Sequence, residues 1–160
     1  MPSRPMLMVV ASAGGHWVQL MRMRKVWDGL HVTYLSTEPG LADIVKTMAR
    51  NEGNPPPKFS SVTDANLSEK LRLMRQLFEV FFLVLRHRPD VIITTGAAPG
   101  YFALRFGKLF GARTIWIDSM ANAEKLSRSG QEVRKYADLW LTQWEHLARP
   151  EGPHFMGAVL

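Results

Sequence analysis

The sequence predicts an α/β fold of the Rossmann-like kind, a parallel sheet with helices on both faces, in one domain over residues 1–160. Short apolar segments typical of strands alternate with segments whose apolar residues recur at the helical period, as in βαβ units. Two expected strands also run directly into glycine turns that open a helix. We therefore expect the ligand site at the carboxyl ends of the strands.

The expected strands are short runs of large apolar and β-branched residues bounded by turn residues. Most consist mainly of apolar residues, which is typical of strands covered on both faces of a parallel sheet. The run after the Pro-rich loop 51–57 is the most polar and the weakest strand signal. In chain order, the expected strands are Leu7–Ala11, Val32–Ser36, Lys58–Val62, Val91–Thr95, Thr114–Ile117 and Leu139–Gln143.

The expected helices fill the intervals between these strands. The first begins at Trp17, directly after a Gly-Gly-His turn, and the fourth begins behind Pro99, a residue favoured at the first helical position. The expected helices are Trp17–Val26, Ala42–Arg50, Leu67–His87, Gly100–Phe110 and Glu132–Tyr136.

The helix expected at 67–87 carries more apolar surface than one core face needs. Asn66 is its expected N-cap, with Glu69 three residues later, and Pro89 follows its end. Its apolar residues form two adjacent stripes. The first comprises Leu67, Leu71, Met74, Phe78, Phe81, Phe82 and Leu85, and the second Leu73, Leu77, Val80 and Val84.

Two interpretations of these stripes stay open. Either both pack inside the domain, or one meets a membrane surface or a partner, with nearby arginines on anionic headgroups. Under the second interpretation, charges at Leu77 and Val80 are expected to abolish that binding. The helix does not span a bilayer, because its densest apolar stretch, 77–85, is short and contains Glu79.

Composition narrows the function. The net charge of +6 at pH 7 and the pI of about 10.0 favour anionic partners. The chain has no cysteine, which excludes disulfides and thiolate chemistry. No nucleic-acid-binding motif, Walker loop or HExxH zinc motif is present. We expect neither a metal nor a cofactor, and no nucleic-acid partner.

The first glycine turn is the leading candidate for a binding site. Ser12, Gly14, Gly15 and His16 join the first strand to its helix. Adjacent glycines let backbone N–H groups approach an anion without Cβ obstruction. His16 is then either a locally hydrogen-bonded residue of the helix start or a base beside the bound group.

Two further loops repeat this design. The turn with Gly96, Pro99 and Gly100 would face the first one, so that two helix N-termini form a cradle for a diphosphate. After the next strand, Asp118 and Ser119 follow in a position where a carboxylate orients a sugar hydroxyl or accepts a proton. Arg128 in the same loop is a candidate phosphate ligand. Each of these candidates also has a purely structural interpretation. The glycine turn is then only a capped turn, Asp118 caps a helix, and Arg128 is solvated.

Together these segments resemble a known family. The segments SAGGHWVQL, TTGAAPGYFALRFGKLFGARTIWIDS, LSRSG and YADLWLTQWEHL occur in this order, and the resemblance covers essentially the whole chain. They are similar to the PssD-type subunit of bacterial exopolysaccharide glycosyltransferases. The same family includes the membrane-recruiting acceptor subunit of the eukaryotic UDP-N-acetylglucosamine transferase of N-glycan assembly.

The resemblance implies half an enzyme, the N-terminal lobe of a MurG-like GT-B glycosyltransferase. A separate PssE-like polypeptide would hold the UDP-sugar, and the pair would extend a lipid-diphosphate-linked sugar at the cytoplasmic face of the inner membrane. Gly14, Gly15, His16, Gly96 and Pro99 match the family's loops. Asp118 stands where relatives commonly have Glu, and Asn122 where they often have Arg.

On this basis we expect an acceptor-binding glycosyltransferase subunit with His16 or Asp118 as the base. Two other functions stay open. In the first, the chain is a non-catalytic membrane scaffold for a catalytic partner. In the second, it is a standalone nucleotide-binding protein, which would bind a UDP-sugar tightly by itself.

Overall fold

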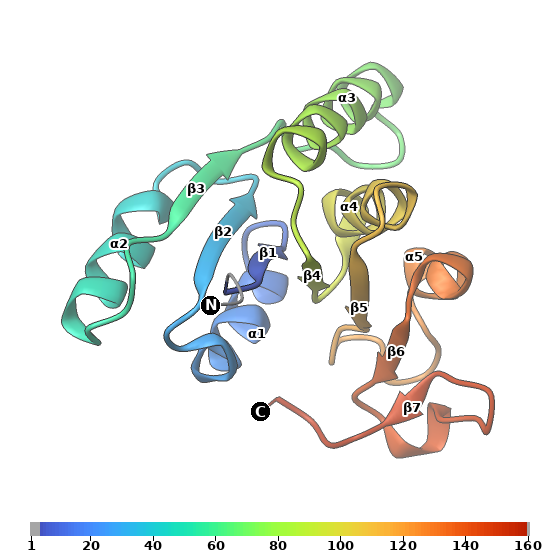
Figure 1. Cartoon of the computed structure of the whole chain (residues 1–160). Helices are drawn as coiled ribbons and strands as arrows, with labels where there is room; N and C mark the ends of the chain where they lie inside the picture. The colour runs from blue at the N-terminus through green and yellow to red at the C-terminus, as the bar shows by residue number, and fades with distance from the viewer. Residues whose placement is uncertain (1–3, 160) are drawn as a thin grey trace.

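The computed structural model describes residues 4–159 and contains one seven-stranded sheet in which all neighbouring strands are parallel (Figure 1). The strand order is β3-β2-β1-β4-β5-β6-β7, so the chain starts at the centre, builds one half of the sheet and then crosses to the other. The predicted Rossmann-like fold class is confirmed. The strands are β1 (Met6–Val10), β2 (His31–Ser36), β3 (Lys58–Ser61), β4 (Val91–Thr94), β5 (Arg113–Ile117), β6 (Leu139–Thr142) and β7 (His154–Phe155).

All six expected strands are present, each within a residue of its expected ends. The sequence analysis missed β7, which pairs with β6 at the sheet edge. This strand has only two residues, and both are exposed. It therefore lacks the buried apolar run by which the other strands are recognised.

Helices cover both faces of the sheet, and each face has its own core. Helices α1 (Gly15–Arg22) and α2 (Leu41–Asn51) pack on one face with the 3₁₀ turn η1 (Arg24–Trp27). Helices α3 (Lys70–His87), α4 (Ala97–Leu109) and α5 (Arg128–Glu132) and the turn η2 (Val133–Tyr136) lie on the other. A third 3₁₀ turn, η3 (Glu145–Leu147), follows β6.

Several helix boundaries differ from the expected ones. The first helix begins at Gly15 and gives way to η1 after Arg22, because Met23 closes the α-helical turn. Helix α4 begins at Ala97, so Pro99 is its third residue rather than its first. There it still removes no helical hydrogen bond, since the first-turn N–H groups have no intrahelical acceptor.

The expected N-cap of the long helix was wrong. Helix α3 begins at Lys70, and Asn66 lies in a separate turn before it. The Asn66 side chain accepts a hydrogen bond from the Ser68 N–H at 3.0 Å, while the Asn66 N–H donates to Glu69 Oε2 at 3.2 Å. The capping residues thus stabilise a turn that precedes the helix instead of the helix itself.

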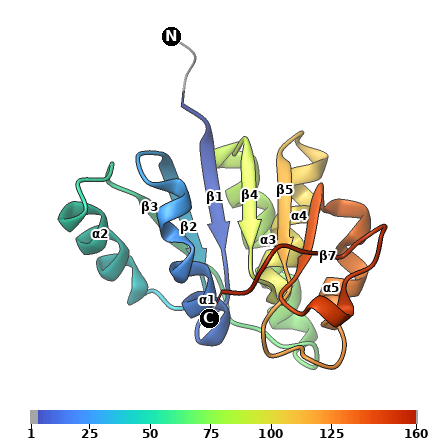
Figure 2. The same ribbon diagram turned by 90° about the horizontal axis from the view of Figure 1, so that it is seen from below.

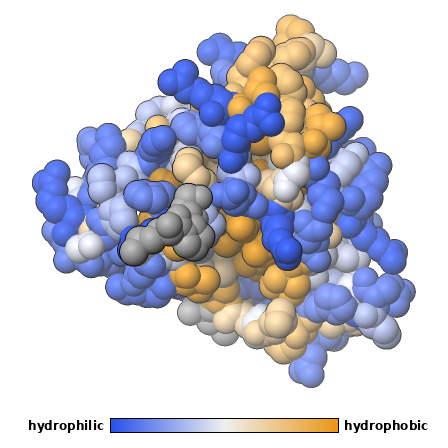
Figure 3. Space-filling view, in the orientation of Figure 1, coloured by the Kyte–Doolittle hydropathy of each residue, from blue (hydrophilic) through white to orange (hydrophobic). Residues whose placement is uncertain are grey.

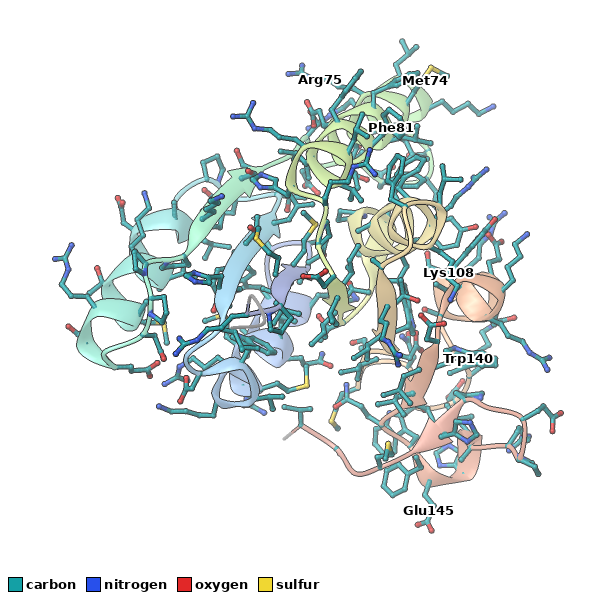
Figure 4. The ribbon with its side chains drawn as sticks, in the orientation of Figure 1. Met74, Arg75, Phe81, Lys108, Trp140 and Glu145 are labelled. Carbon is teal, nitrogen blue, oxygen red and sulfur yellow. The ribbon has the colours of Figure 1, made fainter. Side chains whose placement is uncertain are left out.

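The two apolar stripes of α3 face in opposite directions. Val80 and Val84 are fully buried against the sheet, and Leu73 and Leu77 pack beside them. The other stripe is exposed, with Figure 4 showing Met74 on the outer side of the helix. Its exposed members are Leu67, Leu71, Met74, Phe78 and Phe82.

Two residues of the first stripe, Phe81 and Leu85, are not exposed like its other members. Phe81 is half-buried because its ring packs on Phe106 of α4, with the centroids 5.1 Å apart. Leu85 is likewise half-buried. Charges at Leu77 and Val80 would disrupt the core, so the surface that can meet a membrane or partner is the other stripe.

The parallel strands bring all of their carboxyl ends to one edge of the sheet. In Figure 2 the strands run downward, and this edge lies at the bottom, where α1 begins. The loop between β5 and α5 and the segment that enters α3 lie at the same edge. The candidate site loops are therefore neighbours, as the fold class predicts.

Candidate functional site

The first two glycine turns meet at the carboxyl edge of the sheet. The His16 ring lies so close to Gly96 that a Cβ at position 96 would stand 3.1 Å from the ring atoms Cδ2 and Nε2. The Thr95 hydroxyl donates a hydrogen bond of 2.7 Å to the His16 carbonyl oxygen, which joins the two turns. Gly96 also has a φ of +122°, a conformation that other residues rarely adopt. Only glycine satisfies both conditions.

The surroundings of His16 keep its imidazole neutral. Burial lowers its pKa below the ordinary value of 6.5, and the nearby negative charge of Asp118 opposes this shift. The Ser12 hydroxyl lies 3.4 Å from Nδ1, while Nε2 faces Gly96. A neutral histidine near pH 7 can accept a proton, which is the property that a general base needs.

Helices α1 and α4 both start at this place. Their N-caps are Gly14 and Gly96, and neither helix has a side-chain cap. Uncapped first turns present backbone N–H groups and the positive end of the helix dipole. The predicted pair of helix N-termini is thus present, and their arrangement suits an anion.

A cleft of about 450 Å³ opens beside these turns. His16, Ala97 and Ala98 form its floor together with the loop that follows β5. The turn before α3 forms one wall, and the start of α5 forms the other. These walls include Ala65, Asn66 and Leu67 on the α3 side and Ser127, Arg128 and Ser129 on the α5 side.

Asp118 lies beneath the cleft, with 1% of its surface exposed. Its Oδ1 accepts hydrogen bonds from Trp116 Nε1 at 3.0 Å and from the Ser127 hydroxyl at 2.6 Å. Its Oδ2 accepts from the Ser127 N–H at 2.9 Å and from Asn122 Nδ2 at 3.1 Å. Gly130 packs against this carboxylate with no room for a Cβ. The arrangement fits a carboxylate that holds the loop 119–127 better than one that takes a substrate proton.

Two glutamines that the sequence analysis did not consider connect the site to the rest of the sheet. Gln19 of α1 donates to the Ser119 hydroxyl at 3.0 Å and accepts from the Met120 N–H at 3.1 Å. Gln143 donates to Gln19 Oε1 at 2.7 Å and accepts from the Val159 N–H at 2.9 Å. The sequence offered one signal for these residues, namely their positions inside the segments SAGGHWVQL and YADLWLTQWEHL.

Two predicted binding residues lie in the interior instead. Gly100 and Pro99 are buried, and a Cβ on Gly100 would overlap the side chain of Thr94. Gly100 therefore allows α4 to pack closely on β4. Gly14 and Gly15 differ from it, since a Cβ on either would meet no atom within 4 Å.

Two predicted ligands border the cleft in different ways. Ser119 is nearly buried, with its hydroxyl engaged by Gln19. Arg128 is exposed on the rim and forms an ion pair of 3.2 Å with Glu132 on the next turn of α5. Such exposed pairs are weak, so the guanidinium can exchange this carboxylate for a phosphate.

The chain matches the protein family described as "Oligosaccharide biosynthesis protein Alg14 like" over residues 7–159. The chain belongs to the Alg14 family. Curated relatives include UDP-N-acetylglucosamine transferase subunit ALG14 of Yarrowia lipolytica, 30% identical over 91% of this chain and 76% of the relative. The subunit of the same name from Mus musculus is 25% identical over 88% of this chain and 76% of the relative.

Solved structures agree on the fold. MurG of Acinetobacter baumannii superposes on 96% of this Alg14-family chain with a TM-score of 0.68 and 11% identity. A putative UDP-N-acetylglucosamine 2-epimerase of Listeria monocytogenes superposes on 88% with a TM-score of 0.62 and 10% identity. The chain spans 45% and 39% of those two proteins, so it corresponds to less than half of each.

Two glycine substitutions test which of these glycines is required for packing in this Alg14-family member. Gly100→Ala should lower the free energy of unfolding by about 1–3 kcal/mol, because its Cβ would overlap Thr94. Gly15→Ala should leave stability unchanged or raise it by up to ~1 kcal/mol, because its Cβ meets open space. Urea unfolding of both variants measures the difference. Equal stability of the two would contradict the assigned packing role of Gly100.

A substitution at Asp118 tests its assigned role. Asp118→Asn replaces one acceptor oxygen with an NH₂ group that faces donors, so we expect a loss of about 1–3 kcal/mol of stability. Amide hydrogen exchange should become faster across residues 119–130. Unchanged stability and exchange, together with lost activity, would instead assign Asp118 to the chemistry.

Proposed function

We propose that this chain is the acceptor-binding subunit of a two-component glycosyltransferase. In this proposal it holds a lipid-diphosphate-linked sugar, and a separate polypeptide holds the UDP-sugar. The observation that carries the proposal is the neutral His16 imidazole against Gly96, between two helix starts that have no side-chain cap. This combination supports a base beside an anion site, which transfer to a phosphorylated acceptor requires.

The family supports a divided enzyme. The ALG14 relatives are named as subunits of a UDP-N-acetylglucosamine transferase. This chain corresponds to less than half of MurG. A GT-B glycosyltransferase has two lobes, and residues 4–159 form a single sheet with helices on both faces, the fold of one such lobe.

The proposed reaction uses the site as follows. The acceptor diphosphate lies against the first turns of α1 and α4, with Arg128 on the rim. The attacking sugar hydroxyl gives its proton to His16 as its oxygen bonds to the anomeric carbon of the donor, and UDP leaves with the electrons of the broken bond. Of the two bases expected from the sequence, the geometry favours His16. Asp118 is instead a positioning residue, since its oxygens already accept hydrogen bonds from the protein.

The biological setting is part of the proposal. The PssD-type resemblance favours exopolysaccharide synthesis with a PssE-like donor subunit, at the cytoplasmic face of the inner membrane. The net charge of +6 suits anionic lipids. Within residues 4–159, no helix is long and apolar enough to cross a bilayer.

The catalytic part is tested by coexpression with a PssE-like donor-type subunit. His16→Ala should lower kcat for transfer from UDP-sugars to a synthetic lipid-diphosphate acceptor by roughly 10²–10⁴-fold, the usual contribution of a general base. His31→Ala, at the exposed start of β2 and so at the opposite edge of the sheet, serves as the matched histidine control. Full activity of His16→Ala would favour the non-catalytic scaffold, which the exposed face of α3 independently supports.

The pH dependence gives a second test of the same base. Because burial lowers the pKa of His16 below 6.5, the imidazole is half protonated only at a pH below that value. We therefore expect kcat/KM to fall on acidification with its midpoint below pH 6.5. A midpoint above 6.5 would contradict the assignment.

Membrane association is proposed for the exposed stripe of α3, where Figure 3 shows a hydrophobic patch bordered by hydrophilic surface. Met74 and Phe78 lie at its centre, with 57% and 54% of their surface exposed. Not every nearby cation is available for headgroups, since Arg72 pairs with Glu69 and Arg75 with Glu79. The apolar contacts therefore carry most of the proposed binding.

The membrane proposal predicts that Met74→Asp/Phe78→Asp abolishes flotation with vesicles of phosphatidylcholine and phosphatidylglycerol. The fold should survive, because both side chains point away from the core. Val26→Asp is a matched control, since Val26 is 76% exposed but lies in η1 on the other face of the sheet. Equal flotation of both variants would exclude α3 as the membrane contact.

A further inference from the structure

The α3 wall of the cleft differs in chemistry from the rest of the site. The opposite wall presents Ser127, Arg128 and Ser129, whereas this wall presents Ala65, Leu67 and Asn66, whose side-chain oxygen already accepts hydrogen bonds from Ser68. The floor beneath it is also apolar at Ala97 and Ala98. The cleft therefore has a polar side and an apolar side.

Leu67 is held rigidly in an exposed position. Its neighbours form a closed turn, in which the Ser68 N–H donates to Asn66 Oδ1 and the Glu69 N–H donates to the Asn66 carbonyl at 3.1 Å. The preceding segment is fixed to α3, because Glu79 accepts hydrogen bonds from both the N–H and the hydroxyl of Thr63. Even so, 60% of the surface of Leu67 is exposed. A large apolar side chain fixed at a cleft edge without being buried is suited to an apolar ligand.

Leu67 also starts the exposed stripe of α3. Leu71, which is 84% exposed, follows after four residues, and Met74 and Phe78 continue in steps of three and four. Within the helix, these steps keep Leu71, Met74 and Phe78 on one face, and Leu67 lies in the turn that precedes the helix. From Leu71 to Phe82 the stripe extends about 17 Å at 1.5 Å per residue. The exposed face of α3 thus begins four residues after Leu67, the large apolar residue of the cleft wall.

We propose that Leu67 and Leu71 form a subsite for the apolar chain of a diphosphate-bearing amphiphile, at the point where the chain leaves the cleft. This inference rests on the proposed function and names how its acceptor is recognised. The diphosphate lies at the helix starts of α1 and α4, and the first apolar units lie over Leu67 and Leu71. The remaining chain follows α3 toward the bilayer. The subsite selects acceptors by the apolar character of the carrier next to the diphosphate.

The test compares two probes that share the diphosphate group. The purified full chain is titrated with farnesyl diphosphate and with inorganic diphosphate, in buffer without detergent or vesicles. We expect farnesyl diphosphate to bind at least tenfold more tightly. In Leu67→Ser/Leu71→Ser this ratio should approach one, through weaker farnesyl diphosphate binding and unchanged binding of inorganic diphosphate.

The matched control is Leu109→Ser. Leu109 is 71% exposed but ends α4, twelve residues beyond the cleft residue Ala97, or about 18 Å along the helix. This variant should keep the wild-type ratio. Equal binding of both probes by the wild type, or a ratio that survives Leu67→Ser/Leu71→Ser, would overturn the subsite.

An assay of sugar transfer distinguishes failure of the subsite from failure of the proposed function on which it rests. Transfer by the assembled enzyme with no farnesyl preference would remove the subsite and keep the acceptor role. A preference that depends on Leu67 and Leu71, with no transfer to any lipid-diphosphate acceptor, would keep the subsite and remove the glycosyltransferase role.

Discussion

The site depends on the close approach of the His16 ring to Gly96. Two βα turns from adjacent central strands meet there, and a Cβ at position 96 would stand only 3.1 Å from the ring. The contact excludes water from part of the imidazole and lowers its pKa. It also holds two helix starts next to each other. The same packing therefore creates both the base and the anion site of the proposed reaction.

A second layer of polar contacts keeps these parts in register. Asp118 fixes the loop after β5 from below, and Gln19 fixes it from α1, the helix that also carries His16. Through Gln143, the same network reaches the segment near Val159. Buried polar groups of this kind favour one arrangement strongly, because each broken hydrogen bond leaves an unsatisfied group. The loop after β5 is thus held by hydrogen bonds from two other parts of the chain.

Helix α3 contributes both to the core and to the exposed surface. One stripe of the helix completes the core, and the opposite stripe begins at the wall of the cleft and continues over the outer surface. A lipid-linked acceptor has a charged group and a long apolar chain, and the protein presents matching surfaces in the same order. Acceptor binding and membrane association would then use one continuous face.

The sequence by itself determined the fold class, the six longer strands and the family. These follow from local signals, namely apolar runs, helical periodicity and glycine turns, and the carboxyl ends of parallel strands must then share an edge. It also predicted that the glycine turns that contain His16 and Gly96 lie side by side, as they do in the structure.

Only the tertiary structure decided which of these residues face the cleft and which support it. Asp118 and Gly100 carry the same sequence signals as ligands, but the packing of Ser127 and Thr94 against them turns both toward the interior. The two stripes of α3 are equally apolar, and the sheet covers only one. Gln19 and Gln143 showed no pattern of their own, because partners more than a hundred residues apart meet only in the folded chain.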